Sequence, residues 1–326
     1  MSLNGAFWIS KPEGLTSSDV VVRLKKTLTE FGYFNRFPEG PKGPKLNLKI
    51  GHGGTLDPFA TGVLVILVGE GTKLADAYLH STKSYRGIIA LGSRTDTGDR
   101  TGSVVEEKPV SELPPAEWQA LADTFTNELY WQTPPMYSAK KHQGQSLHHL
   151  ARQGIEVERK AILKKIEEFH VRPLNANELE FQITCESGTY VRVIAEDLAK
   201  KAGMVGHLKT LERTQTSDAE LKECLGLEPF IALLAEQTPL AAMTAFHPIT
   251  KIAEHLPSIW VDPRRASDLK NGVVRTSQDV CFEAHHLYPT RRYALVRLNT
   301  PDHAPVALLE NEFEHERFRL QRIIHA

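Results

Sequence analysis

The chain has 326 residues, 41% hydrophobic and 24% charged, which is typical of a globular protein long enough for two domains. Its longest purely apolar run, Val63 to Val68, is far shorter than the ~20 residues of a membrane-spanning helix. The net charge of −1 excludes a chain that is basic throughout, although basic residues can still gather on one surface.

The first 250 residues predict strands and helices in mixed order. Apolar residues at helical spacing follow Ser17, and continuous or alternating apolar stretches mark the strands. The expected elements are, in chain order, a strand at 7–10, a helix from about 17 to 31, a strand at 62–69, a short helix at 73–80, a strand at 85–92, a helix starting at 114–115, a helix at 146–153, a strand at 181–186 and a helix at 190–202. Because strands and helices do not alternate regularly, we predict an α+β fold with a mixed sheet.

The last part of the chain predicts a second, smaller domain. Residues 238–257 have no clear periodicity and contain Pro239, Pro248 and Pro257, so we expect a linker there. Beyond it, short strands are expected at 260–261, 273–275, 293–298 and 307–310. We therefore predict a domain at 1–250 and a β-rich domain at 251–326.

Cysteine usage and the first residues bear on the compartment. Three widely spaced cysteines, Cys185, Cys224 and Cys281, indicate neither a disulfide framework nor a zinc site. The first five residues have neither the basic start nor the apolar region of a secretion signal. We expect a protein of the reducing cytoplasm.

Basic residues gather in one stretch. Residues 131–165 contain seven Lys or Arg against Glu156 and Glu158, together with three His. Such a stretch can bind a polyanion, but it can equally be an ordinary solvated face.

Two other patterns predict no ligand. Gly69 to Lys73 resembles a phosphate-binding loop, but Thr72 separates Gly71 from Lys73, so a strand-to-helix turn is the better interpretation. Adjacent histidines such as His148 and His149 do not share a helix face, and no Cys or carboxylate completes a metal site. We expect no metal.

The stretch GHGGTLDPFATG, residues 51–62, places Asp57 in a glycine-rich loop before a buried strand. Asp57-Pro58 is either a turn initiator or a carboxylate displayed at the rim of a crevice. Two further stretches place an aromatic residue beside a cation: Tyr85 follows Lys83, and Tyr190 precedes Arg192. An aromatic ring and an Arg in one crevice would suit a nucleobase, although each short motif alone can be structural.

The order and spacing of the motifs carry a family resemblance. The series is Lys11-Pro12-x-Gly14-x-x-Ser17, GHGGTLDPFATGVL, Lys83-Ser84-Tyr85, GSRTDTGDRTG, QTPPMYSAK at 132–140, Ala151-Arg152-x-Gly154-Ile155, SGTYVRV and Thr210-Leu211-Glu212-Arg213-Thr214. Over residues 5–217 it resembles the TruB family of tRNA pseudouridine synthases. The tail resembles the PUA-like C-terminal domain of that family through Leu256-Pro257, Val261-Asp262 and Lys270-Asn271-Gly272.

The resemblance implies an isomerase. Members convert uridine to pseudouridine, typically uridine 55 of the tRNA T-loop, by breaking the glycosidic N1 bond, turning the base and rejoining it through C5. It further implies base flipping, no cofactor, the tRNA T-arm as partner, no obligatory protein partner, no membrane and a monomer.

The resemblance also assigns roles to residues. Asp57 matches the catalytic carboxylate, acting as nucleophile or general base, and Arg192 matches the arginine that pairs with it. Tyr85 matches the aromatic residue that stacks on the target base, and Tyr190 matches a tyrosine near the reacting base. Expected substrate-binding residues are Lys11, which supports the active-site loop, His52, Gly53, Gly54, Thr55, the pocket wall Leu211, and the basic Lys140, Lys141 and Arg152.

Three departures from the family pattern concern RNA docking rather than chemistry. They are Gly53-Gly54-Thr55, the long loop at 32–47, and Ser217 in place of a Gly. Two alternatives stay close to this interpretation: a pseudouridine synthase for another structured RNA, and a non-catalytic RNA-binding or RNA-folding protein. A third, a small-molecule phosphate enzyme that uses Gly69 to Lys73, predicts ATP or GTP binding.

Overall fold

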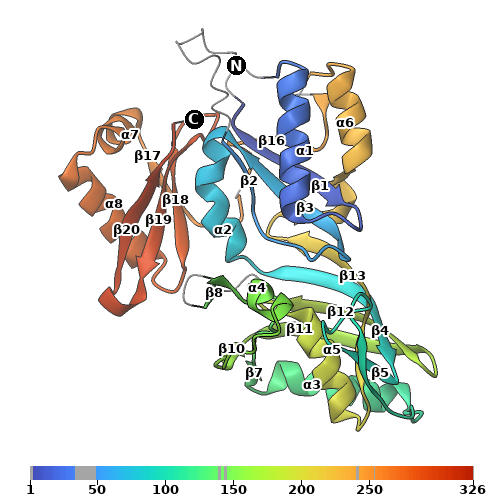
Figure 1. Cartoon of the computed structure of the whole chain (residues 1–326). Helices are drawn as coiled ribbons and strands as arrows, with labels where there is room; N and C mark the ends of the chain where they lie inside the picture. The colour runs from blue at the N-terminus through green and yellow to red at the C-terminus, as the bar shows by residue number, and fades with distance from the viewer. Residues whose placement is uncertain are drawn as a thin grey trace. The chain divides into compact units, whose positions relative to one another are not determined.

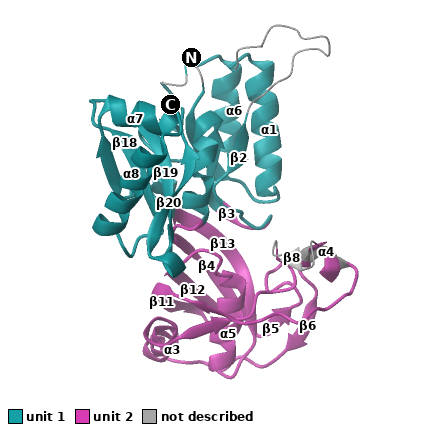
Figure 2. Cartoon of the chain, turned by 90° about the vertical axis from the view of Figure 1, so that its left-hand side faces the viewer, with its two compact units in different colours: residues 1–58, 62–79, 216–326 teal, residues 59–61, 80–215 magenta. Residues whose placement is uncertain are grey.

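The computed structural model describes residues 3–33, 49–138, 141–142, 145–239, 242–252 and 254–325. The chain forms two compact units (Figure 2). The first unit contains Met1–Pro58, Gly62–Leu79 and Thr216–Ala326, and the second contains Phe59–Thr61 and His80–Gln215. The first unit is therefore built from both ends of the chain.

Two apolar strands organise the first unit. β1 (Gly5–Lys11) pairs antiparallel with β3 (Thr61–Val68) along its whole length, from Gly5 opposite Val68 to Lys11 opposite Gly62. β1 also pairs with β15 (Leu225–Gly226) and β16 (Phe246–Pro248), and β3 with β2 (Ile50–His52). The expected linker thus contributes a strand to the sheet, because Phe246 to Pro248 form the ladder with Gly5 to Phe7.

Both faces of this sheet are covered. On one face, α1 (Ser17–Glu30) and α6 (Leu227–Ala235) bury Leu24, Leu28 and Phe230 against Phe7 and Ile66. Thr16 and Asp19 form a capping box that starts α1. On the other face lie η1 (Gly69–Leu74) and α2 (Ala75–Leu79). The remaining short elements of this part are β14 (Ala219–Glu220) and η2 (Leu221–Glu223).

The last part of the chain forms a second sheet, so the β-rich tail predicted from the sequence is confirmed. Its strand order is β17 (Ser258–Val261), β18 (Tyr293–Leu298), β19 (Pro305–Glu312) and β20 (Arg317–Ile323), with η4 (Phe313–His315) before the last strand (Figure 1). α7 (Pro263–Lys270) and α8 (Val274–Leu287) pack on one face. The strand expected at 273–275 is wrong: α8 begins at Val274, because Thr276, Val280 and Ala284 recur at helical spacing and are buried.

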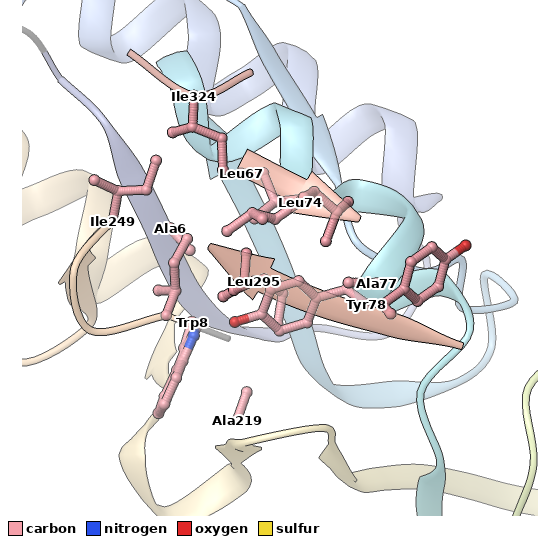
Figure 3. Close-up of a cluster of buried hydrophobic side chains, with 14 of the residues drawn as sticks. Ala6, Trp8, Leu67, Leu74, Ala77, Tyr78, Ala219, Ile249, Leu295 and Ile324 are labelled. Carbon is pink, nitrogen blue, oxygen red and sulfur yellow. The ribbon is translucent and has the colours of Figure 1, made fainter. Parts of the chain in front are cut away.

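The other face of the C-terminal sheet joins the core of the first unit. Leu295 and Ile324 share one buried cluster with Trp8 of β1 and Tyr78 of α2 (Figure 3). Leu308 belongs to the same cluster. The division at residue 250 stays a prediction, but these side chains give residues 251–326 a core in common with the N-terminal strands.

The second unit is a sheet covered by helices on one face. The strand order is β11 (Ile166–Asn175), β12 (Glu178–Cys185), β4 (Lys83–Leu91) and β13 (Gly206–Thr216). α3 (Pro115–Asn127) and α5 (Val191–Lys201) bury their apolar sides, and Phe125 packs edge-on against Phe169. Smaller elements are β5 (Ser93–Thr95), β6 (Val104–Glu107), β7 (Tyr130–Gln132), β8 (Lys141–His142), β9 (Gln145–Ser146), α4 (Leu147–Arg152) and β10 (Ile162–Lys164).

The mixed α+β class with a small β-rich C-terminal sheet is confirmed. Within the described ranges, no helix combines the length and apolar character needed to cross a bilayer.

Candidate active site

The loop that carries Asp57 is tied to the start of the chain. Lys11 stands at the end of β1 with no exposed surface, and its Nζ donates to the carbonyls of Leu15 at 2.7 Å, Pro12 at 2.9 Å and Pro58 at 3.3 Å. The Gly14 N–H also donates to the Pro58 carbonyl, at 2.8 Å. The residue that follows Asp57 is thus held at two points, which supports the expectation that Lys11 carries this loop.

A second contact holds the residue that precedes Asp57. The buried Ser17 hydroxyl accepts from the Leu56 N–H at 2.9 Å and lies 3.3 Å from the Leu56 carbonyl oxygen. Asp57 itself is half-buried between these anchored neighbours. The Lys-Pro-x-Gly-x-x-Ser and LDP motifs therefore form one local structure.

Gly53 and Gly54 occupy positions that favour glycine. The Gly53 N–H donates to the Val65 carbonyl at 2.8 Å, and a Cβ on Gly53 would lie 2.7 Å from Cβ of Tyr78. Gly54 has φ of +150°, which L side chains rarely adopt. His52 ends β2 opposite Ile66, half-buried, and Thr55 is exposed.

In the second unit, Arg192 is fixed by two loops. Its side chain is buried near the start of α5, where Nη1 donates to the Thr97 carbonyl at 2.6 Å and Nη2 to the Tyr137 carbonyl at 2.8 Å. Its Nε lies 3.9 Å from Oδ2 of the buried Asp99. Three nitrogens of the planar guanidinium thus face three different residues, an arrangement that a lysine could not reproduce.

Asp99 lies beside the predicted site residue Arg192, although the sequence predicted no role for it. Its Oδ1 accepts from the Thr101 N–H at 2.9 Å and from the Thr97 hydroxyl at 3.0 Å, so the carboxylate is held in place. It belongs to the GSRTDTGDRTG stretch, one of the motifs that carry the family resemblance, but the resemblance assigned no role to any residue of this stretch. A buried carboxylate near a buried guanidinium stabilises its charge.

Burial shifts the pKa of two ionisable side chains in the second unit. It raises the pKa of Glu196 of α5 to about 7, although the nearby Arg94 and Arg192 act to lower it. On β4, burial and then the Arg213 guanidinium lower the pKa of Lys83 to about 7, while the Cys185 thiol acts in the opposite direction.

The remaining predicted residues are placed as follows. Tyr85 is half-buried on β4 opposite Ile183, and Leu211 is buried on β13. Tyr190 is the residue before α5, with its backbone held by Gln132 of β7, a second residue that the sequence did not single out. The pairing of Asp57 with Arg192 stays a prediction.

The basic stretch is only partly described. Lys140 lies outside the described residues, and of Lys141 in β8 and Arg152 in α4 only the backbone is described. A cavity of about 250 Å³ on the second unit is bordered by Tyr85 together with Ser84 and Thr184, which are not predicted site residues; the other predicted site residues do not line it within the described part of the chain. Among the described residues, no cluster of His, Cys, Asp or Glu has the arrangement of a metal site.

Comparison with known proteins places these features in context. Residues 43–191 match the TruB family pseudouridylate synthase N-terminal domain. A tRNA pseudouridine synthase B of Nitrosococcus oceani is 37% identical over 270 residues, covering 83% of this chain and 82% of the relative. One from Escherichia coli is 38% identical over 249 residues, covering 76% and 73%.

Two Psychrobacter relatives, also named tRNA pseudouridine synthase B, are longer than the match. That of Psychrobacter cryohalolentis is 40% identical over 240 residues, which are 73% of this chain and 62% of the relative. The chain spans 59% of the length of the Psychrobacter arcticus protein.

Solved structures share the fold. The chain aligns with a structure titled "Crystal Structure of a Cbf5-Nop10-Gar1 Complex" at a TM-score of 0.67 and 21% identity, covering 94% of this chain and 78% of that one. A structure titled "Structure of H/ACA RNP bound to a substrate RNA containing 2'-deoxyuridine" also gives 0.67, at 18% identity, covering 99% and 86%.

Proposed function

This chain belongs to the TruB family of pseudouridylate synthases, and from this we propose that it is a tRNA pseudouridine synthase that converts uridine 55 of the T-loop to pseudouridine. The observation that carries the proposal is the loop of Asp57, anchored on both sides by Lys11, Gly14 and Ser17. Several relatives that match most of this chain are named for the same activity on tRNA.

The reaction is an isomerisation, so it consumes no second substrate. The N1–C1′ bond breaks, the base turns, a C5–C1′ bond forms, the C5 proton leaves to solvent and N1 gains a proton. A carboxylate can serve this sequence either by attacking a carbon or by removing the C5 proton, and both roles suit Asp57. We propose Asp57 as the catalytic carboxylate, with Arg192 as the cation that keeps it ionised.

The other residues receive binding roles in this proposal. The target base leaves the folded T-loop at an unstacking cost of a few kcal/mol and stacks on Tyr85, with Leu211 as an apolar wall and Tyr190 beside the reacting base. His52 and Thr55 line the RNA-facing side of the loop, and the buried Gly53 and Gly54 give its backbone the conformation that RNA binding requires. Lys140, Lys141 and Arg152 contact T-arm phosphates, which makes affinity fall with salt. The enzyme works as a monomer in the cytoplasm, without a protein partner or cofactor.

Tritium release tests this function. The purified chain alone is given a tRNA transcript labelled with tritium at uridine C5, and in parallel a transcript in which uridine 55 is replaced by cytidine. We expect the uridine 55 transcript to release one more equivalent of tritium than the cytidine transcript, since pseudouridine formation expels that hydrogen. Release from another structured RNA instead would favour a different substrate, and tight binding without release from any RNA would favour a non-catalytic protein.

A further inference from the structure

The side-chain amide of Gln132 makes two hydrogen bonds to the backbone of a single residue, Tyr190. Gln132 ends β7 and is 1% exposed. Its Oε1 accepts from the Tyr190 N–H at 2.8 Å, and its Nε2 donates to the Tyr190 carbonyl at 3.1 Å. The amide therefore contacts both backbone polar groups of Tyr190. The Tyr190 carbonyl also accepts from the Val193 and Ile194 N–H groups at 3.1 and 3.3 Å, whereas the N–H is held by Gln132.

This grip lies where the chain turns from loop to helix. Tyr190 has extended backbone angles and precedes α5 without a side-chain cap of its own. The Gln132 amide fixes the direction in which α5 begins, because Tyr190 is the last residue outside the helix. Arg192 follows two residues later, in the first turn.

Two further contacts link the same segments. The Tyr137 carbonyl accepts from Nη2 of Arg192 at 2.8 Å. The Tyr130 hydroxyl donates to Oδ2 of Asp197 at 2.7 Å and accepts from Nε2 of Gln132 at 3.3 Å. Residues 130–137 thus contact the 190–197 segment at three points, with the buried Gln132 amide at the centre.

We propose that Gln132 is a positioning residue that sets the placement of Tyr190 and Arg192 for the reaction. This inference rests on the proposed function, which puts these two side chains at the reacting base. The Gln132 amide holds the peptide groups on both sides of the Tyr190 Cα, so it restrains the backbone direction at this residue. A displacement of about 1 Å in a catalytic group can lower a rate by about 100-fold.

The chain contains a matched control. Gln119 of α3 makes the same kind of clamp on β11: its Nε2 donates to the Phe169 carbonyl at 2.9 Å, and its Oε1 accepts from the Val171 N–H at 3.0 Å. Both glutamines lie in the second unit, but none of the backbone groups that Gln119 holds belongs to a proposed site residue. A purely structural role predicts that the two glutamines behave alike.

The test compares Gln132→Met with Gln119→Met at similar side-chain volume. Each change removes two hydrogen bonds to the backbone and one to a side chain, which is the Tyr130 hydroxyl for Gln132 and Oδ1 of Asp123 for Gln119. For each, the melting temperature, the dissociation constant for tRNA and the single-turnover rate of tritium release are measured. We expect both variants to lower the melting temperature, Gln132→Met more because Gln119 is only half-buried. We expect Gln132→Met to lower the single-turnover rate by about 10- to 100-fold with little change in the dissociation constant, and Gln119→Met to leave the rate near wild type.

Gln132→Glu is the second variant. It keeps the acceptor for the Tyr190 N–H, but its ionised carboxylate would be buried against the Tyr190 carbonyl, so we expect a rate at least as low as that of Gln132→Met. When protonated, the carboxyl can donate to that carbonyl again, so the rate relative to wild type should recover as the pH falls; this pH dependence decides the question if Gln132→Met does not fold. Equal rates for the Gln132 and Gln119 variants, or a loss confined to RNA binding, would overturn the inference while leaving the proposed function intact. Wild-type protein without tritium release would overturn both.

Discussion

Two cations of the proposed site are buried by different means. Lys11 places its ammonium among three backbone carbonyls, so its partners belong to the loop that it supports. Arg192 combines two carbonyls with the Asp99 carboxylate. In both cases the charge is offset by groups that are themselves fixed, which makes the cation a rigid part of the site rather than a mobile one.

A third buried cation gives a pH prediction. Burial lowers the pKa of Lys83 from 10.5 to about 7. Between about pH 7 and 10 the unfolded chain therefore binds more protons at this residue than the folded chain, so stability should rise with pH in that window. One proton corresponds to a slope of at most about 1.4 kcal/mol per pH unit.

The measurement is urea unfolding of the wild type and of Lys83→Met at several pH values. The free energy of unfolding of the wild type minus that of Lys83→Met should increase as the pH rises from about 7 to 10. Lys26→Met, which removes an exposed lysine of α1, is the control for losing a lysine. A constant difference between wild type and Lys83→Met across the window would refute the prediction.

At the level of elements, the loop from Gly53 to Pro58 combines a tight core contact with a displayed carboxylate. The glycine-rich stretch can be recognised in the sequence, but the sequence does not show why glycine is needed at each position. In the structure, position 53 favours glycine because it packs directly against Tyr78. That contact joins residues 25 positions apart and leaves no periodic signal in the sequence.

Gly53→Ala should therefore disturb the site, because its Cβ would lie 2.7 Å from the Tyr78 Cβ. We expect a loss of about 1–3 kcal/mol in the free energy of unfolding and of about 10-fold or more in turnover. Gly51→Ala is the matched control, since nothing lies within 4 Å of its added Cβ. If both variants kept wild-type turnover, the loop would not need the close contact.

For the whole molecule, local patterns predicted much of the fold. Helical spacing located α1 and α5, apolar runs located β3 and β4, and the β-rich tail was correctly expected. The motif series identified the family and the residues now proposed for the site. Periodicity failed at α8, where two valines indicated a strand.

Long-range contacts were beyond the reach of the sequence. The Gln132 clamp on Tyr190 spans 58 positions, and the Arg192 contact with Thr97 spans 95. Asp99 and Gln132 both lie in motifs of the family series, but the identity of a single polar residue does not predict which distant residue it contacts. The shared core between the C-terminal sheet and β1 escaped prediction for the same reason.

That shared core can be tested with neighbouring leucines of β19. Leu308 and Leu309 are both fully buried, but Leu308 faces the cluster with Trp8 and Tyr78, while Leu309 faces α7 and α8. Each change to Ala should cost about 2–5 kcal/mol. Only Leu308→Ala should also speed amide hydrogen exchange in β1 and β3. Unchanged exchange there would favour an independent domain at 251–326.

The most direct measurement concerns Asp57. Tritium release and tRNA binding are compared for the wild type, Asp57→Asn and Asp279→Asn, the last being an exposed carboxylate of α8. If Asp57 is the catalytic carboxylate, Asp57→Asn keeps its affinity for tRNA and releases no tritium, while Asp279→Asn stays near wild type. Full turnover by Asp57→Asn would contradict the account of this site.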